Sequence, residues 1–178
     1  AAPCALIISL PIAMAAGIAG AGKRGILIKG GAHLEHLGVI KTIAFDKTGT
    51  LTHGRPEVTD VIAVRDDDRT LISMAAGLEQ YSGHPLARAI LKYAAARDIP
   101  KAEVANTRTL MGSGILGEVE KQDIYLGNPK LFRDLGQSLK EVDTLIDNLE
   151  KQGKTVVALG DVLQVYGLIA LQDTLREN

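Results

Sequence analysis

The sequence predicts an α/β fold in which one long apolar helix precedes alternating strands and helices. Residues 1–22 carry no charged side chain, and Lys23 and Arg24 follow directly. Short apolar runs typical of buried strands then alternate with amphipathic stretches typical of helices. The 178 residues carry a net charge of −1, with 3% aromatic residues, which argues against a polycationic or base-stacking nucleic-acid reader. We therefore expect no nucleic-acid partner.

The apolar stretch at residues 1–22 is long enough to cross a bilayer. As one helix it would measure about 33 Å, close to the thickness of the hydrocarbon core. The basic pair that follows is typical of the cytoplasmic end of a membrane helix. A signal peptide would place its basic residues before the apolar run, and a buried soluble helix is the remaining alternative. We expect a membrane helix and a chain cut from a longer membrane protein.

Local signals place the remaining elements. Three successive acids at 66–68 can cap a helix, Pro85 suits a first helical turn, and Ser138 with Glu141 forms a capping-box pattern. The expected elements are strands at 39–46 and 57–64, helices at 66–80 and from Pro85, a hairpin of 116–120 with 124–127, a helix from Ser138 to about Gly153, and strands at 154–159 and 162–171.

The strongest chemical signal is the run Asp46-Lys47-Thr48-Gly49-Thr50-Leu51-Thr52, which follows the apolar stretch at 39–46. A carboxylate at the tip of a buried strand can act as a covalent nucleophile and accept a phosphoryl group as an acyl phosphate. Neighbouring main-chain groups and hydroxyls can hold that group, and Mg²⁺ would offset the repulsion between it and Asp46. An ordinary strand-to-turn junction is the alternative.

Several motifs resemble those of a known family. The run Asp46-Lys47-Thr48-Gly49-Thr50 resembles the phosphorylation signature of P-type ATPases, and other positions resemble the heavy-metal-transporting branch, in particular the zinc/cadmium exporters. The matching positions are Pro3-Cys4 for the intramembrane metal motif, Ser82 to Ala87 with Glu79 for the His-Pro motif, Gly112-Ser113-Gly114 and Gly127-Asn128 for the glycine elements, and Asp173 with Arg176 for the return segment.

The resemblance implies a fold with four segments. It predicts a partial haloacid-dehalogenase-like phosphorylation domain, preceded by a membrane helix and interrupted by an α+β nucleotide-binding domain with an antiparallel sheet and flanking helices. The implied boundaries are a transmembrane helix end at 1–24, the start of the phosphorylation domain at 25–55, the nucleotide-binding domain at 56–167 and a truncated return at 168–178.

The resemblance also implies a function, namely ATP-driven export of a heavy-metal cation through an aspartyl phosphate at Asp46. Zinc or cadmium is preferred, while cobalt and copper stay open. Lys47, Thr48 and Thr50 would support catalysis, Asp46 and Thr48 would hold Mg²⁺, and Cys4 would contact the transported cation. The other partners would be the rest of the polypeptide, with its actuator domain and membrane helices, in a cell membrane with cytoplasmic soluble domains. This chain alone is not expected to turn over.

ATP is expected in the inserted domain. The resemblance assigns it to Glu79, His84, Gly112, Gly114, Gly127 and Asn128. His84 could instead cap the helix that follows it, and Cys4 could be a small buried apolar residue. Two other functions remain open: a stand-alone adenine-nucleotide-binding module, and a soluble phosphatase of the same superfamily. Thr48 argues against the phosphatase, because hydrolytic members of that superfamily carry a second Asp there.

Overall fold

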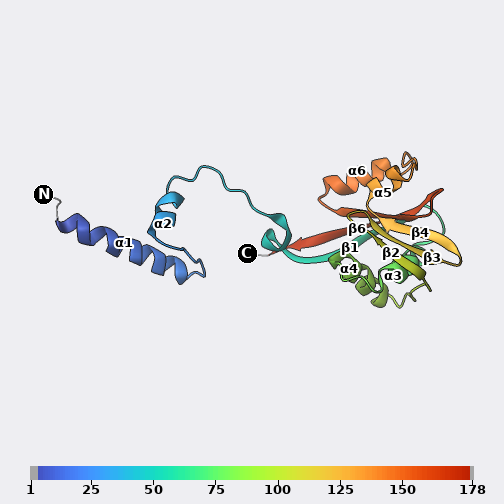
Figure 1. The fold of residues 1–178 in the computed structure, drawn as a ribbon, viewed down its shortest axis with the longest axis horizontal. Coiled ribbons are helices and arrows are strands. Elements are labelled where there is room, and N and C mark those ends of the chain that lie inside the picture. The colour runs from blue at the N-terminus through green and yellow to red at the C-terminus, as the bar shows by residue number, and fades with distance from the viewer. Residues whose placement is uncertain (1–3, 177–178) are drawn as a thin grey trace. The chain divides into compact units, whose positions relative to one another are not determined.

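The computed structural model describes residues 4–176, apart from the side chains at positions 4–6, 47, 48 and 175 (Figure 1). The chain forms two compact units, Ala1–Phe45 and Asp46–Asn178, which are treated separately below. The finer division into segments ending at 24, 55 and 167 stays a prediction.

The first unit is a pair of helices, α1 (Cys4–Gly22) and α2 (Gly31–Leu37). Glycine lets them pack closely, because a Cβ built on Gly17 would stand 2.9 Å from Cδ2 of Leu34. A Cβ built on Gly31 would likewise stand 2.6 Å from the Met14 sulfur. The pair is therefore held by small residues that face larger apolar side chains.

The apolar N-terminal stretch forms a helix, but it does not meet the expectation of a membrane span. Within residues 4–176, no helix combines the length and the apolarity needed to cross a membrane. The expected transmembrane helix at 1–24 is thus not found in the described part of the chain. From Ala13 onward α1 consists mainly of Ala and Gly, whose small side chains offer little apolar surface.

The second unit is built on a six-stranded sheet with the order β1-β6-β5-β4-β3-β2. Each neighbouring pair is antiparallel. The strands are β1 (Thr52–Ala63), β2 (Ala105–Leu110), β3 (Gly114–Val119), β4 (Gln122–Gly127), β5 (Thr155–Gly160) and β6 (Val165–Leu175). The antiparallel sheet with flanking helices that the resemblance implies is confirmed.

Helices cover both faces of this sheet, giving three layers (Figure 1). One core packs α3 (Asp68–Glu79) and α4 (Pro85–Ala95) against the sheet, and the other packs α5 (Pro129–Asp134) and α6 (Asp143–Lys151). Side chains alternate between the faces along a strand, so Val157 and Leu159 join the first core while Val156 and Ala158 join the second.

Local capping signals are borne out at both helices of the first core. The Asp67 carboxylate accepts a hydrogen bond from the Thr70 backbone N–H at 2.8 Å, and Pro85 occupies the first turn of α4. The predicted hairpin also forms, as β3 and β4. Its two-residue turn places Glu120 and Lys121 at φ of 50° and 69°, which suits the twist of the paired strands.

The strand expected at 39–46 does not form. Residues 40–46 have no regular secondary structure, and Val39, Ile43 and Phe45 are 74%, 66% and 64% exposed. A strand is stable only when its backbone groups join a ladder, and the six described strands pair with one another. Apolar composition alone therefore mispredicted this segment.

The capping box expected at Ser138 and Glu141 is also wrong. Helix α6 begins only at Asp143, and its N-cap residue Val142 makes no side-chain capping bond. The preceding segment forms a turn instead, in which the N–H groups of Val142 and Asp143 both donate to the Leu139 carbonyl, at 2.8 and 2.7 Å. Leu139 and Val142 are buried, so packing into the second core determines where this helix starts.

Candidate functional site

A cavity of about 320 Å³ lies where the α3–α4 loop meets the sheet. It is called the Glu79 cavity here, and its size is within the range of small-molecule sites. All six residues predicted to bind nucleotide contribute to its wall. The lining residues are Glu79, Ser82, His84, Leu86, Ile90, Thr109, Leu110, Gly112, Ser113, Gly114, Ile115, Leu126, Gly127, Asn128, Thr155, Val156 and Val157.

Glu79 supplies the carboxyl group of this cavity from the last residue of α3. Its side chain is half-buried beside apolar residues such as Leu86 and Ile90. Burial raises the pKa of the Glu79 carboxyl above its ordinary value, while a hydrogen bond from Ser82 and the nearby His84 work in the opposite direction. The Glu79 carboxylate is thus a partly desolvated hydrogen-bond acceptor. A ligand that donates hydrogen bonds to it can stabilise its charge.

His84 caps the helix that follows it and also lies in the wall of the Glu79 cavity. It is the N-cap of α4, where its Nδ1 accepts a hydrogen bond from the Leu86 backbone N–H at 3.2 Å. It also lines the Glu79 cavity with an exposed side chain. Because Nδ1 acts as an acceptor, the neutral ring carries its proton on Nε2, which makes that atom a hydrogen-bond donor.

Gly112 and Gly114 serve different purposes in the β2–β3 turn. Gly112 has φ of +72°, and a Cβ built there meets no atom within 4 Å. Gly114 has φ of +157°, and a Cβ there would stand 2.2 Å from the Leu126 carbonyl oxygen. Gly112 therefore leaves open space at the cavity wall, whereas Gly114 permits the close approach of β3 to β4. The expectation that both let a ligand approach the backbone is supported by open space only at Gly112.

Asn128 holds the rim of the cavity together. Its Oδ1 accepts from the Leu131 backbone N–H at 2.9 Å and so caps α5, while its Nδ2 donates to the Gly112 carbonyl at 3.1 Å. Gly127 pairs with Gly114 across the β3–β4 ladder, and a Cβ on Gly127 would stand 2.3 Å from the Ser113 carbonyl oxygen. These two residues act on the shape of the cavity.

Sequence reasoning missed the hydroxyl groups that the sheet brings to this cavity. Thr109 lies on β2 and Thr155 on β5, and both line the wall. Neither belongs to a motif, and a single threonine in a strand gives no local sign of a ligand. Only the order and register of the strands place them in the wall of the same cavity as Glu79.

The signature run lies apart from the Glu79 cavity, since none of its residues lines that cavity. Asp46 is exposed, and Lys47–Leu51 form one π-helical turn. The Gly49 backbone N–H donates to Oγ1 of Thr52 at 3.1 Å and closes the turn. Thr50 is exposed, and the side chains of Lys47 and Thr48 lie outside what the structure describes.

Asp173 and Arg176 connect the end of β6 to the turn of Lys47–Leu51, which is called the signature turn here. The Asp173 carboxylate accepts from the Thr52 hydroxyl and from the backbone N–H groups of Gly54 and Arg55, the latter two at 3.0 and 2.9 Å. Desolvation acts to raise the pKa of Asp173, but these hydrogen bonds dominate and hold it below its ordinary value.

Arg176 donates hydrogen bonds to carbonyl groups in and next to the same turn. Its Nε donates to the Thr52 carbonyl at 3.0 Å, and its Nη2 donates to the Gly49 carbonyl at 3.1 Å. Its backbone N–H also donates to the Leu51 carbonyl at 2.9 Å. These bonds join the segment that follows β6 to the turn of Lys47–Leu51 and to the start of β1.

Metal ligands are not assembled in the described part of the chain. No group of three His, Cys, Asp or Glu side chains there is arranged to hold an ion. Cys4 begins α1, but its side chain lies outside the described residues. Mg²⁺ is usually bound by one or two carboxylates together with substrate phosphates, so the exposed Asp46 carboxylate fits as one ligand of a site that a phosphate would complete.

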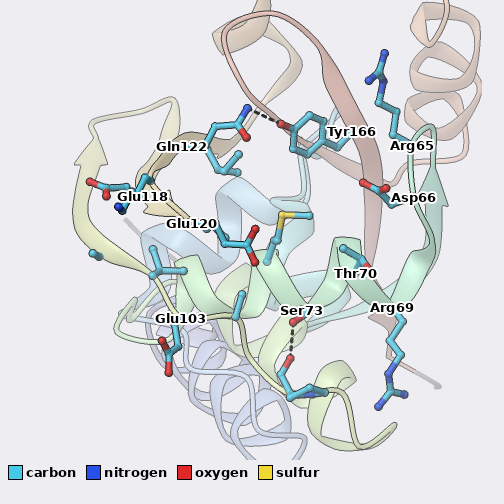
Figure 2. A pocket seen from close by; sticks show the side chains of 18 of the residues that line it. Arg65, Asp66, Arg69, Thr70, Ser73, Glu103, Glu118, Glu120, Gln122 and Tyr166 are labelled. Atoms are coloured by element: carbon cyan, nitrogen blue, oxygen red, sulfur yellow. Dashed lines mark hydrogen bonds between the residues drawn. The ribbon is translucent and has the colours of Figure 1, made fainter.

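A larger cavity, of about 1260 Å³, contains none of the predicted site residues (Figure 2). It is lined by both signs of charge, including Arg69 and Glu120. Gln122 donates to the Tyr166 hydroxyl at 3.1 Å, and that hydroxyl donates to Asp161 at 2.8 Å. Burial, followed by the bond to Asp161, raises the pKa of Tyr166 to about 12. This tyrosine is therefore a neutral structural group at physiological pH.

Comparisons with known proteins agree with the motifs. Residues 40–178 match a family model described as haloacid dehalogenase-like hydrolase. The chain is 44% identical over 181 residues to a cadmium-transporting ATPase of Staphylococcus aureus, covering 98% of this chain and 25% of that protein. It is 44% identical over 176 residues to the zinc/cadmium/lead-transporting P-type ATPase of Escherichia coli K12, covering 98% of this chain and 23% of that protein.

The fold is similar to that of solved transport ATPases. The crystal structure of a zinc-transporting PIB-type ATPase in the E2.Pi state superposes with a TM-score of 0.69 at 42% identity, covering 98% of this chain and 28% of that chain. This chain spans about a quarter of the length of the curated relatives it matches.

Proposed function

Since the chain belongs to the haloacid dehalogenase-like hydrolase family, we propose that it is the ATP-binding and phosphoryl-accepting part of a heavy-metal P-type ATPase. Zinc or cadmium is the preferred cation, because the two relatives described above carry cadmium in their names and one of them also carries zinc. Cobalt and copper remain alternatives. The pump would work in a membrane together with the rest of its polypeptide.

The observation that carries the proposal is the assembly of the Glu79 cavity. Six residues chosen from sequence, spread over a helix end, loops and strand ends, line one cavity of about 320 Å³. Its walls combine apolar side chains with a half-buried carboxyl group and an imidazole donor. An adenine ring suits this lining, because its faces are apolar and its exocyclic amine can donate to Glu79.

Asp46 would receive the γ-phosphoryl group. One carboxylate oxygen forms a bond to the γ-phosphorus, the bond from that phosphorus to the β–γ bridging oxygen breaks, and ADP leaves with the electron pair. Mg²⁺, when held by Asp46 and the main chain of Thr48, supplies positive charge to the phosphoryl oxygens. Thr48 stands where hydrolytic members of the superfamily have an acid, so the acyl phosphate would persist long enough to drive transport.

The transported cation would pass Cys4. A thiolate beside Pro3 offers a soft ligand, which suits zinc, cadmium or copper. The other ligands would come from membrane helices in the rest of the polypeptide.

Calorimetric titration of the 178-residue chain with Mg²⁺-ATP tests the nucleotide site. The Glu79→Gln variant should bind ATP about tenfold or more weakly, because a hydrogen bond to a charged partner is worth about 1.5–3 kcal/mol. Glu103→Gln is the matched control, since Glu103 lines only the larger cavity. Equal affinities for all three proteins would refute the placement of adenine beside Glu79.

Phosphorylation is tested in a longer protein. Residues 4–176 replace the matching quarter of the Staphylococcus aureus relative, and the chimera is incubated with radiolabelled ATP and cadmium. The chimera should acquire an acid-stable label, and Asp46→Asn should abolish it because an amide is not a nucleophile. Label that persists in the Asn variant would show that another residue accepts the phosphoryl group.

A further inference from the structure

A second cavity, of about 630 Å³, lies on the neighbouring face of α4. It is called the Arg88 cavity here. Arg55, Arg88 and Lys92 give its wall three permanent cations against one carboxylate, that of Glu57. The lining residues are His53, Gly54, Arg55, Pro56, Glu57, Pro85, Arg88, Ala89, Lys92 and Thr174.

The two arginines determine the net charge of the cavity lining, because Lys92 and Glu57 neutralise each other. Lys92 Nζ lies 2.6 Å from Oε1 of Glu57, so the one carboxylate is matched by an ion pair. That contact lowers the pKa of Glu57, which stays ionised at neutral pH. Arg55 and Arg88 therefore give the lining its excess positive charge.

Arg88 is held in place at the start of α4. Its Nη2 donates to the Gly83 carbonyl at 3.0 Å, and the side chain is exposed to the cavity. A guanidinium group has five N–H donors in a planar fork, so one bond to Gly83 fixes its position and leaves donors for the oxygens of an anion.

The Arg88 cavity adjoins the Glu79 cavity through the first turn of α4. His84 and Leu86 line the Glu79 cavity, whereas Pro85 and Arg88 line the Arg88 cavity. The short span from His84 to Arg88 thus separates an apolar cavity with a carboxyl group from a cationic one.

The opposite wall of the Arg88 cavity adjoins the signature turn. It is formed by His53 to Glu57, directly after that turn. A Cβ built on Gly54 would stand 3.5 Å from the Cα of Gly49, so the backbone at Gly54 packs against the signature turn. The cationic cavity is therefore bordered by the first turn of α4, which also borders the Glu79 cavity, and by the residues that follow the signature turn.

We propose that the Arg88 cavity receives the triphosphate of a nucleotide whose base occupies the Glu79 cavity. This inference rests on the proposed function and adds a phosphate subsite to it. Arg88 and Arg55 make charge-assisted hydrogen bonds to phosphate oxygens and direct the γ-phosphate toward Asp46. The subsite makes the chain prefer ATP to AMP, because AMP has the same base but does not reach as far into the cationic cavity.

The test compares ATP and AMP on the 178-residue chain by calorimetry. Arg88→Gln and Arg55→Gln should each weaken ATP binding about three- to tenfold while AMP binding changes less than about twofold, as expected for loss of one exposed charge-assisted bond. Arg108→Gln is the matched control, because exposed Arg108 on β2 lines neither cavity. Arg88→Lys should restore part of the preference for ATP, since it keeps the charge without the planar fork.

Inorganic tripolyphosphate separates this inference from the proposed function. In a ³¹P NMR titration it should bind the unmodified chain and bind Arg88→Gln more weakly, whether or not adenine occupies the Glu79 cavity. If tripolyphosphate binds as tightly as ATP does, the adenine site is refuted and the anion site is kept. Equal ATP affinities for the Arg88 and Arg108 variants, or a parallel loss of ATP and AMP binding, would overturn the phosphate subsite.

Discussion

Replacing glycines in the β2–β3 turn should separate a ligand-facing position from a structural one. At Gly112, with φ of +72° and no atom within 4 Å of a built Cβ, alanine should cost only the left-handed backbone penalty of about 1–2 kcal/mol. At Gly114 a Cβ would stand 2.2 Å from the Leu126 carbonyl oxygen, so alanine should cost about 3–5 kcal/mol from backbone strain and overpacking together.

Gly136 provides a control for the backbone term. It has φ of +82°, a built Cβ meets nothing within 4 Å, and it does not line the Glu79 cavity. Gly112→Ala and Gly136→Ala should therefore lower the Tm by a similar few degrees, and Gly114→Ala by about 10 °C. Relative to Gly136→Ala, Gly112→Ala should also weaken ATP binding by about tenfold, because Gly112 lines the Glu79 cavity and its added methyl group would take up space there.

Thermal unfolding by circular dichroism and calorimetric titration with Mg²⁺-ATP measure the two effects on the same proteins. If Gly112→Ala binds ATP as well as Gly136→Ala does, the open space at Gly112 is not used by the ligand. If Gly114→Ala is as stable as Gly112→Ala, the close approach of β3 and β4 does not require glycine.

Two further predictions concern acids with shifted pKa values. Because the pKa of Glu79 is raised in the folded state, the folded state loses stability as pH rises from about 4.5 through that higher pKa. In thermal scans the Tm of Glu79→Gln should therefore exceed that of the unmodified chain at about pH 8, and the two Tm values should converge near about pH 4. A variant that melts lower at pH 8 would contradict this. The lowered pKa of Asp173 has the opposite sign: its contribution is present above about 3.8 and is lost as pH falls further. Asp173→Asn should therefore be less stable than the unmodified chain in urea at pH 7, because an amide cannot accept from all three donors, and a difference that does not shrink toward pH 3 would refute this role.

The sequence motifs predicted part of the candidate site. The resemblance to P-type ATPases chose Glu79, His84, Gly112 and Asn128, and the cavity contains all four. The haloacid dehalogenase-like superfamily that the resemblance implies is confirmed by the match over residues 40–178. The motifs could not distinguish Gly112, which borders open space, from Gly114, which is required by the neighbouring strand. They also gave no sign of Arg88, because the charge of a cavity depends on which elements enclose it.

Local signals were enough to specify several elements of this fold. The Asp67 cap, Pro85 in the first turn of α4 and the β3–β4 hairpin depend on contacts within a few residues, so the local sequence was sufficient to predict them. Tertiary structure decided the rest. The segment at 39–46 has strand composition but no described partner strand, and α6 starts at Asp143 because Leu139 and Val142 are drawn into the core. The hydrogen bond from the Thr52 hydroxyl to the Asp173 carboxylate joins groups that are far apart in the sequence. No local pattern specifies this bond, because only the pairing of β1 with β6 brings the two residues together.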